Sequence, residues 1–232
     1  MPSISVCPKV FTASTPAGIP PQTLQAHFNR GFYQLGITPA TLGRSVLITP
    51  NLCGPGLPEH HYSMTSRDAV VAAVQLIRSF GVEEIGLAAH PADYVAKLEM
   101  RDQFFDAIGI RSLASELGFK FYDLGIEGFE EREGIFVSSV LNRYETILNI
   151  MPPKTHHQSV VSLALKNIGM GCTDHRSNMH ESLTDAVVRA NIFIRQERNV
   201  IDIVHGGWGQ EENGPHFGIG NLPGDLIKLY GR

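Results

Sequence analysis

The sequence predicts an α/β fold, with a mostly parallel sheet covered by helices on both faces in a single domain. Short runs rich in β-branched residues alternate along the chain with segments of helical period, which is typical of a parallel sheet. With 232 residues, 43% of them hydrophobic, the chain is long enough to bury one full core. It contains no internal repeat, linker or low-complexity tract, so we expect one domain.

The N-terminal segment differs from the rest. The first twenty residues are rich in Ser, Thr and Pro without a clear period, and we expect an irregular or extended arm. Apolar residues then recur at steps of three and four, at Leu24, Phe28, Phe32 and Leu35, which predicts an amphipathic helix that ends at Gly36. We assign residues 1–43 to this arm and helix, packed on an α/β domain of residues 44–232.

The α/β domain is expected to alternate strands and helices. The expected strands cover residues 46–48, 85–89, 120–124, 135–140, 146–151 and 200–204. The expected helices cover residues 66–81 with Ser66 as the cap, 104–117, a stretch from about Ser159 to Asn167, and 183–196. We expect the acidic stretch 127–133 to be a loop.

Polar or Gly-rich loops follow the carboxyl ends of four expected strands. These loops cover residues 49–56, 90–93, 154–158 and 205–214. In open α/β sheets, ligands bind beyond the carboxyl ends of the strands. If the strands are parallel neighbours, the four loops converge on one rim, and we expect a single site there.

The strongest candidate cluster is Lys154, His156 and His157, just before the helix expected from Ser159. Free backbone N–H groups and the helix dipole favour an anion at such a position, and Lys154 adds positive charge. Either histidine can supply acid–base function near neutral pH. Adjacent side chains of an extended segment face opposite ways, so we expect at most one histidine to enter the site. The alternative is a solvated Lys154 and a histidine that caps a loop.

Other residues are candidates for substrate binding or catalysis. Lys166 and Asn167 are expected to close the following helix, where they either complement its dipole or contact the pocket together with Asn51. Arg176 either clamps a carboxylate or lies at a solvated helix start. His205, at the end of a buried strand, is a candidate for catalysis or metal binding, and Trp208 for a stacking wall. The alternative for the segment that contains His205 and Trp208 is a Gly-rich turn with a partly buried histidine.

No standard metal spacing is present, but a divalent transition metal remains an open alternative. His90, His156, His205 and Glu212 lie on separate loops and could assemble a mononuclear site. Neither a Walker loop nor a G-x-G-x-x-G sequence after a strand occurs, so we expect no NAD. The G-x-S-x-G nucleophile elbow is absent as well.

Composition excludes several classes of function. The net charge of −4 argues against nucleic acid, and without an 18-residue apolar run we expect no membrane segment. Cys7, Cys53 and Cys172 are widely spaced and odd in number, which indicates free thiols in a reducing compartment. Since no signal sequence opens the chain, we expect a cytoplasmic protein.

Five ordered segments carry a resemblance to a known family. They are residues 46–51, 65–81, 149–156, 165–169 and 203–215, within about residues 44 to 226. The Lys154-Thr155-His156 and Leu165-Lys166-Asn167 pieces, in that order and spacing, are the specific part. The chain resembles the large bacterial and archaeal family catalogued as domain of unknown function 362.

The resemblance implies an α/β fold and a shared polar pocket, but no common reaction. Some relatives carry ferredoxin-like modules, whereas this chain has no cysteine set for an iron–sulfur cluster, and we expect none. Thr49 stands where many relatives have lysine, and His205 where they usually have aspartate. We also expect a C-terminal portion common in relatives to be missing after Asp225. These departures suggest a specialised member, recruited to a biosynthetic pathway.

Our functional hypothesis is an enzyme acting on a small anionic or carbonyl-containing metabolite. His, Lys or metal-assisted acid–base chemistry would make it a lyase, isomerase, cyclase or hydrolase rather than an oxidoreductase. The alternatives are a non-catalytic accessory protein that binds a metal or metabolite, and a redox partner. A homodimer is an open alternative too, because the N-terminal arm and helix have no obvious partner within the chain.

Overall fold

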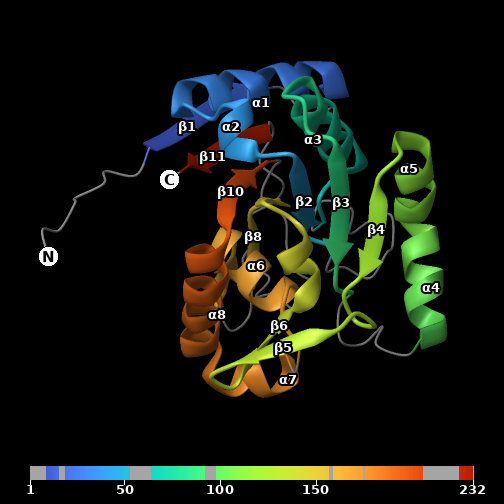
Figure 1. The fold of residues 1–232 in the computed structure, drawn as a ribbon, viewed down its shortest axis with the longest axis vertical. Coiled ribbons are helices and arrows are strands. Elements are labelled where there is room, and N and C mark those ends of the chain that lie inside the picture. The colour runs from blue at the N-terminus through green and yellow to red at the C-terminus, as the bar shows by residue number, and fades with distance from the viewer. Residues whose placement is uncertain are drawn as a thin grey trace, which may run out of the picture.

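A seven-stranded sheet forms the centre of the protein (Figure 1). The computed structural model describes residues 9–15, 19–52, 64–91, 98–156, 159–174, 176–205 and 225–231. Along the sheet the strands are β1 (Lys9–Thr15), β11 (Asp225–Gly231), β10 (Asn199–Val204), β7 (Thr146–Met151), β2 (Ser45–Pro50), β3 (Glu84–Ala89) and β4 (Lys120–Asp123). From β10 to β4 the strands are parallel, and β11 pairs antiparallel with both β10 and β1. The mostly parallel sheet is as the sequence predicts.

Helices cover both faces of the sheet, as expected. The larger core lies on one face, under α1 (Pro21–Leu35), α2 (Pro39–Leu42), α3 (Arg67–Ser79), α4 (Leu98–Ala107) and α5 (Ile110–Leu117). The other face packs on the 3₁₀ helix η3 (Ser139–Arg143), on α6 (Ala164–Gly171) and on α8 (Leu183–Glu197). Strands β2 and β7 are buried along their whole length, which explains why their sequences lack apolar–polar alternation.

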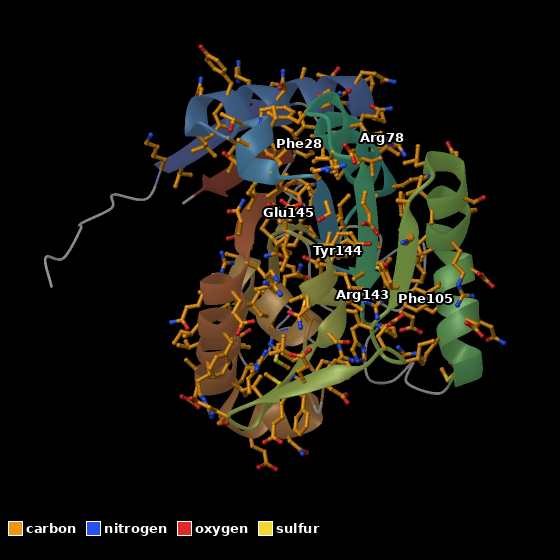
Figure 2. All side chains as sticks on the ribbon, viewed as in Figure 1. Phe28, Arg78, Phe105, Arg143, Tyr144 and Glu145 are labelled. Carbon is orange, nitrogen blue, oxygen red and sulfur yellow. The ribbon has the colours of Figure 1, made fainter. Side chains whose placement is uncertain are left out.

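Side chains that point to the two faces can be followed in Figure 2. Phe28 on α1 is completely buried in the first core, and Phe105 on α4 packs edge-on against Phe121, with ring centroids 4.8 Å apart. On the second face, the hydroxyl of Tyr144 lies 3.0 Å from that of Tyr122. Gly86 makes room for Tyr144, because a Cβ at that position would lie 2.3 Å from its hydroxyl.

The N-terminal segment is part of this architecture. Strand β1 pairs with β11 over seven residues, and α1 buries Leu24, Phe28 and Phe32 in the first core. Gly36 ends α1 in the left-handed conformation, with φ of 74°, as the sequence predicts. The arm and helix therefore have partners within the chain, and the reason given above for a homodimer does not hold.

Several local expectations are wrong. The helix expected at residues 104–117 is two helices, α4 and α5, because Gly109 between them has a positive φ of 69°. The expected acidic loop is largely strand β5 (Phe129–Arg132), which pairs antiparallel with β6 (Ile135–Ser138) outside the central sheet. The turn between these strands, Glu133-Gly134, has positive φ at both residues, as a tight hairpin requires.

The segment after β7 also differs from the expectation. Instead of a helix from Ser159, it forms a small antiparallel hairpin of β8 (Lys154–His156) and β9 (Val160–Ser162), and α6 begins at Ala164. The next elements are the one-turn helix α7 (Arg176–Met179) and the 3₁₀ turn η4 (His180–Ser182), which lead into α8. No helix in the described part of the chain is long and apolar enough to cross a membrane.

Candidate functional site

The carboxyl ends of the parallel strands lie side by side. We call this rim, formed by the ends of β10, β7, β2, β3 and β4, the carboxyl edge. The backbone N–H of His205, just after β10, donates to the carbonyl of Met151 in β7 at 3.0 Å. The N–H of Asn51, just after β2, donates to the carbonyl of Ile150 at 3.1 Å. The chain segments that follow β10, β7 and β2 therefore start from adjacent positions.

Lys154 and Asn51 meet at this edge. The Lys154 side chain is fully buried, and its Nζ donates to Oδ1 of Asn51 at 3.1 Å. Asn51 is held by Thr65, whose backbone N–H donates to the Asn51 carbonyl at 2.8 Å. The Thr65 hydroxyl also donates to the Ile150 carbonyl at 2.8 Å. A buried ammonium group is costly unless it is hydrogen-bonded. Asn51 supplies such a hydrogen bond to Lys154, and Thr65 holds Asn51 in place.

His156 is buried on the same hairpin and meets a second histidine. Its Nδ1 accepts a hydrogen bond from the backbone N–H of Ser159 at 3.2 Å. The ring stacks on that of His180, with centroids 6.3 Å apart and planes inclined by 21°. Nδ1 of His180 lies 2.6 Å from the carbonyl oxygen of Arg176. The β8–β9 hairpin and the α7–η4 segment thus contact each other through two imidazoles.

Arg176 and His90 meet at the end of β3. Nη2 of Arg176 donates to the carbonyl of Pro91 at 2.7 Å, and Nδ1 of His90 lies 3.0 Å from the same oxygen. Arg176 and His90 are therefore neighbours. Through His180 and His156 they connect the end of β3 to the hairpin after β7.

His205 is the most unusual group at the edge. Its side chain is 4% exposed, and its Nε2 is buried without a hydrogen-bond partner within the described parts of the chain. Burial lowers the pKa of His205 from its ordinary value of 6.5 to about 4, so the ring is neutral at pH 7. A buried polar atom without a partner costs stability, and such atoms in native proteins require an explanation. A neutral imidazole nitrogen can accept a proton or bind a ligand.

A row of polar residues lies below the edge, within the strands. Thr49 in β2, Asn149 in β7 and Asp202 in β10 occupy paired positions of the sheet. Asn149 accepts hydrogen bonds from Thr49 Oγ1 at 3.3 Å and from Asn167 Nδ2 at 2.7 Å. It donates to Asp202 Oδ1 at 2.7 Å and to the carbonyl of Ala164 at 3.0 Å. Asn149 therefore joins three strands to the first turn of α6.

The structure gives Asn167 and Lys166 a different setting from the expected one. They do not close a helix but lie in the first turn of α6, since that helix continues to Gly171. Asn167 is buried, and its Nδ2 donates to Asn149 and, at 3.1 Å, to the carbonyl of Thr49. Both hydrogens of this amide thus hold α6 against the sheet. Lys166 is half-buried at a helix start, where it cannot complement the C-terminal dipole.

Sequence reasoning missed Asn149, Asp202 and the contact that His180 makes. Asn149 and Asp202 could have been noticed in the sequence, because each is a polar residue between apolar residues of a buried strand, two positions before its carboxyl end. Such a residue in a buried strand needs polar partners. His180 left no comparable signal, since its contact with His156 depends on the path of the chain between α6 and α8.

The comparison with known proteins gives a family. The model of a family described as domain of unknown function, DUF362, matches residues 46–226, which is most of the chain. The chain belongs to this family. The resemblance inferred from the Lys154-Thr155-His156 and Leu165-Lys166-Asn167 pieces is thereby confirmed.

A crystal structure of a protein from Thermotoga maritima resembles this DUF362 chain in fold. The two are 13% identical with a TM-score of 0.52, and the match covers 94% of this chain and 56% of the other. The chain thus spans a little over half the length of that relative. No curated protein matches the sequence.

Some predicted site residues of the DUF362 chain lie outside the described residues. These are His157, Trp208 and Glu212. The described residues contain no group of three or more His, Cys, Asp or Glu side chains that could hold a metal ion. The metal set of His90, His156, His205 and Glu212 therefore stays a prediction, because Glu212 is not among them.

A buried ion pair lies at the β4 end of the carboxyl edge. Arg101 of α4 is 4% exposed, and Asp123 at the end of β4 is 7% exposed. Nε of Arg101 donates to Oδ2 of Asp123 at 2.9 Å, and Nη2 donates to Oδ1. The backbone N–H of Gly125 donates to Oδ1 of the same carboxylate at 3.0 Å. This pair anchors α4 and fixes the last strand of the edge.

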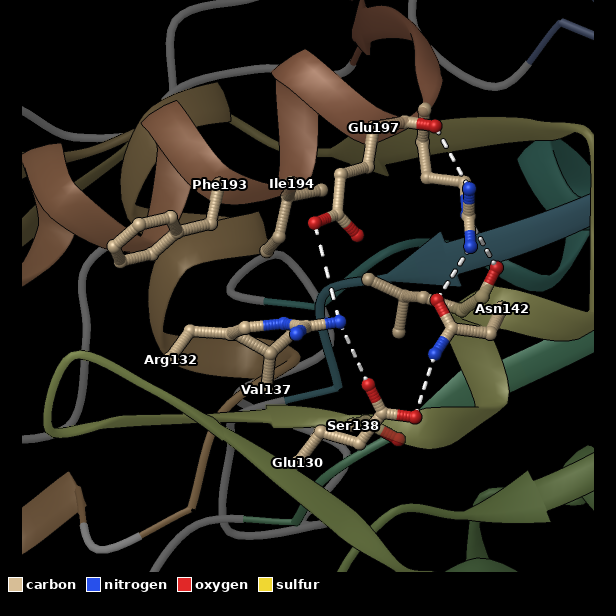
Figure 3. Close-up of a pocket in the computed structure, with 10 residues that line it drawn as sticks. Glu130, Arg132, Val137, Ser138, Asn142, Phe193, Ile194 and Glu197 are labelled. Atoms are coloured by element: carbon tan, nitrogen blue, oxygen red, sulfur yellow. Dashed lines mark hydrogen bonds and ion pairs between the residues drawn. The ribbon is translucent and has the colours of Figure 1, made fainter.

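A shallow groove lies between the β5–β6 hairpin and the C-terminal end of α8 (Figure 3). Its charged side chains contact one another: Arg132 lies 2.9 Å from Glu130 and 3.9 Å from Glu197. Asn142 donates to Glu130 at 2.8 Å and accepts from Arg198. Because these groups already satisfy one another, the groove is a weaker candidate for a site than the carboxyl edge.

Proposed function

We propose that the protein is an enzyme that converts a small anionic or carbonyl-containing metabolite by acid–base chemistry at the carboxyl edge. The observation that carries the proposal is the buried Nε2 of His205, which has no hydrogen-bond partner among the described residues. The lowered pKa keeps this imidazole neutral at pH 7, the form that accepts a proton from a substrate. His205 directly follows the carboxyl end of β10, and in open α/β sheets ligands bind beyond the carboxyl ends of the strands.

Two features support an anionic or carbonyl oxygen as the group that is bound. Lys154 supplies a buried positive charge beside Asn51, and interactions with charge are strong where water is excluded. The N-terminus of α6 has no side-chain cap and carries Lys166 in its first turn. Free backbone N–H groups at a helix start favour negative charge.

The reaction types that fit are lyase, isomerase, cyclase and hydrolase chemistry. Each needs a positioned base and a group that stabilises a developing oxyanion, roles that we assign to His205 and Lys154. We further propose that His156, which is buried near Lys154 on the same hairpin, contacts the substrate. The family itself has no assigned activity that narrows this choice.

The proposal is tested with a panel of small carboxylates, keto acids and phosphate esters. Thermal-shift measurements on wild type and on Lys154→Met identify ligands that depend on the lysine. Mass spectrometry and NMR of the incubated mixtures then detect conversion by wild type, by His205→Asn and by the control His27→Asn. His27 suits the control because its Nδ1 is also buried without a partner among the described residues, but on α1.

We expect an anion that stabilises wild type but not Lys154→Met, and a conversion that is lost in His205→Asn and kept in His27→Asn. If no anion stabilises wild type, the proposal is wrong. If an anion binds through Lys154 and nothing in the panel is converted, the alternative of a metabolite-binding accessory protein is favoured. Stoichiometric transition metal in the purified protein, lost with His205→Asn, would favour metal-assisted chemistry instead.

A further inference from the structure

The two outer strands of the central sheet, β1 and β4, differ in how their outer sides are protected. Strand β4 has only four residues, and its first and last, Lys120 and Asp123, are charged. Its Phe121 packs on Phe105 of α4, and Figure 1 shows α4 and α5 beside the strand. Short length, charge and a covering helix are common means of keeping an outer strand from pairing with another chain. Strand β4 is therefore protected.

Strand β1 lacks these protections along most of its length. All seven of its residues pair with β11 on one side, in a continuous register without a bulge. Within the described parts of the chain, no strand pairs with its other side. The only charged residue of the strand is Lys9, at the first position, and no proline interrupts it. The outer side of β1 therefore presents a row of backbone N–H and C=O groups to a partner strand.

The side chains of β1 fit a second strand of the same sequence. Phe11 and Ala13 are buried on the face that α1 covers, whereas Val10, Thr12 and Ser14 are exposed on the other face. A two-fold axis perpendicular to the sheet keeps the covered faces of both copies on the same side. With the axis at Thr12, the pairs are Thr12 with the partner's Thr12, Phe11 with the partner's Ala13, and Val10 with the partner's Ser14.

This pairing is self-complementary in size and in charge. On the covered face the large ring of Phe11 lies opposite a small alanine, and on the exposed face threonine lies opposite threonine, a favourable cross-strand pair. Lys9 lies opposite position 15, so the only charged residue of the strand does not meet its own copy. An axis at residue 11 or 13 pairs only residues 9–13 or 11–15, so Thr12 is the centre that uses the whole strand.

We propose that β1 is an interface between two copies of this chain, which pair antiparallel about a two-fold axis at Thr12. The two seven-stranded sheets then form one continuous sheet. Main-chain hydrogen bonds between the strands satisfy the outer donors and acceptors of both copies. Such a two-fold contact is the commonest arrangement of identical soluble chains. Because β11 lies between β1 and β10, the inference does not depend on the proposed function at the carboxyl edge.

Sedimentation equilibrium of the full chain measures its mass and the dissociation constant of the dimer. We expect the mass of wild type to approach twice the 25.5 kDa of one chain as the concentration rises. Thr12→Lys places two like charges opposite each other and should raise the dissociation constant roughly fivefold. An equimolar mixture of Thr12→Lys and Thr12→Glu places opposite charges there and should restore association. Since Thr12 is exposed, both variants should keep the circular dichroism spectrum of wild type.

Oxidative cross-linking tests the register. Residues directly opposite in an antiparallel pair have Cα atoms about 4.5–5.5 Å apart, within the range that a disulfide bridges. Thr12→Cys should therefore form a covalent dimer, seen by non-reducing electrophoresis. Ser14→Cys is the matched control, because its two copies lie four residues apart along the strand, about 13 Å, beyond the reach of a disulfide. Wild type reports any cross-linking by the three native cysteines.

Three results would overturn the inference. Wild type that stays monomeric at every concentration would exclude the dimer and leave a strand of another protein as the partner of β1. A dimer that Thr12→Lys does not weaken would be formed through another surface. Cross-linking of Ser14→Cys as strong as that of Thr12→Cys would exclude the axis at Thr12.

Discussion

Asn149 should be essential for the structure that supports the site, and Asn149→Leu tests this. The substitution removes four buried hydrogen bonds, to Thr49, Asn167, Asp202 and Ala164. At about 1 kcal/mol each, the gross loss is about 4 kcal/mol. Two of these partners keep another hydrogen bond, Asn167 with the Thr49 carbonyl and Asp202 with Arg195. Leucine also buries more apolar surface, so we expect a net loss of about 2–3 kcal/mol.

Urea denaturation measures this loss as a fall in the midpoint at unchanged slope. Asn142→Leu is the matched control, because Asn142 also makes two side-chain hydrogen bonds but is exposed beside the groove. Its free energy of unfolding should change by about 0.5 kcal/mol or less. A loss below about 1 kcal/mol for Asn149→Leu, or an equal loss in the control, would refute a role for Asn149 in joining three strands to α6.

Two further predictions concern stability. Between pH 6.5 and about 4 the unfolded state binds a proton that native His205 does not, so stability should be full above pH 6.5 and fall as the pH drops towards 4. The loss of unfolding free energy that His205 contributes is at most about 3 kcal/mol. When unfolding is measured at pH 7.5 and at pH 5, the difference in stability should be smaller in His205→Leu than in wild type. An equal difference in both proteins would contradict the burial of a neutral ring. Arg101→Met should cost about 3–5 kcal/mol by leaving the Asp123 carboxylate buried alone, and the double variant Arg101→Met, Asp123→Leu should recover much of that loss. Additive losses in the double variant would show that the two side chains do not interact.

The sequence predicted the ends of helices well where a single capping residue determines them. Ser66 caps α3 by accepting from the backbone N–H of Ala69, and Gly36 ends α1, both as expected. The helix expected at residues 104–117 failed for the converse reason, since Gly109 lies inside a continuous helical pattern. A glycine within such a pattern can stay helical or adopt positive φ, and only the packing of both helices decides.

The β8–β9 hairpin could not be predicted from periodicity. A short apolar run such as residues 160–165 fits a buried strand and the first turns of a helix equally well. The structure uses its first half as β9 and its second half as the start of α6. That division moves Lys166 and Asn167 from a helix end to a helix start, and with it changes what Asn167 contacts.

The candidate site was predictable as a region but not as a set of contacts. The rule that ligands bind beyond parallel strand ends predicts a site formed by the residues after these strands, such as Asn51, Lys154 and His205. The register shows that the preceding strands β2, β7 and β10 are neighbours. The contact between His156 and His180 depends on two loops that approach through space, and no spacing in the sequence encodes it. The row of Thr49, Asn149 and Asp202 could have been predicted from the sequence. Each is a polar residue near the carboxyl end of its strand, and the register of neighbouring parallel strands places such residues side by side.

A crystal structure with bound ligand tests the central claim most directly, using an anion that stabilises wild type but not Lys154→Met. We expect an oxygen of that ligand within hydrogen-bond distance of Lys154 Nζ, and another of its atoms within that distance of His205 Nε2. A ligand bound instead in the groove between the β5–β6 hairpin and α8, with the carboxyl edge unchanged, would contradict the account.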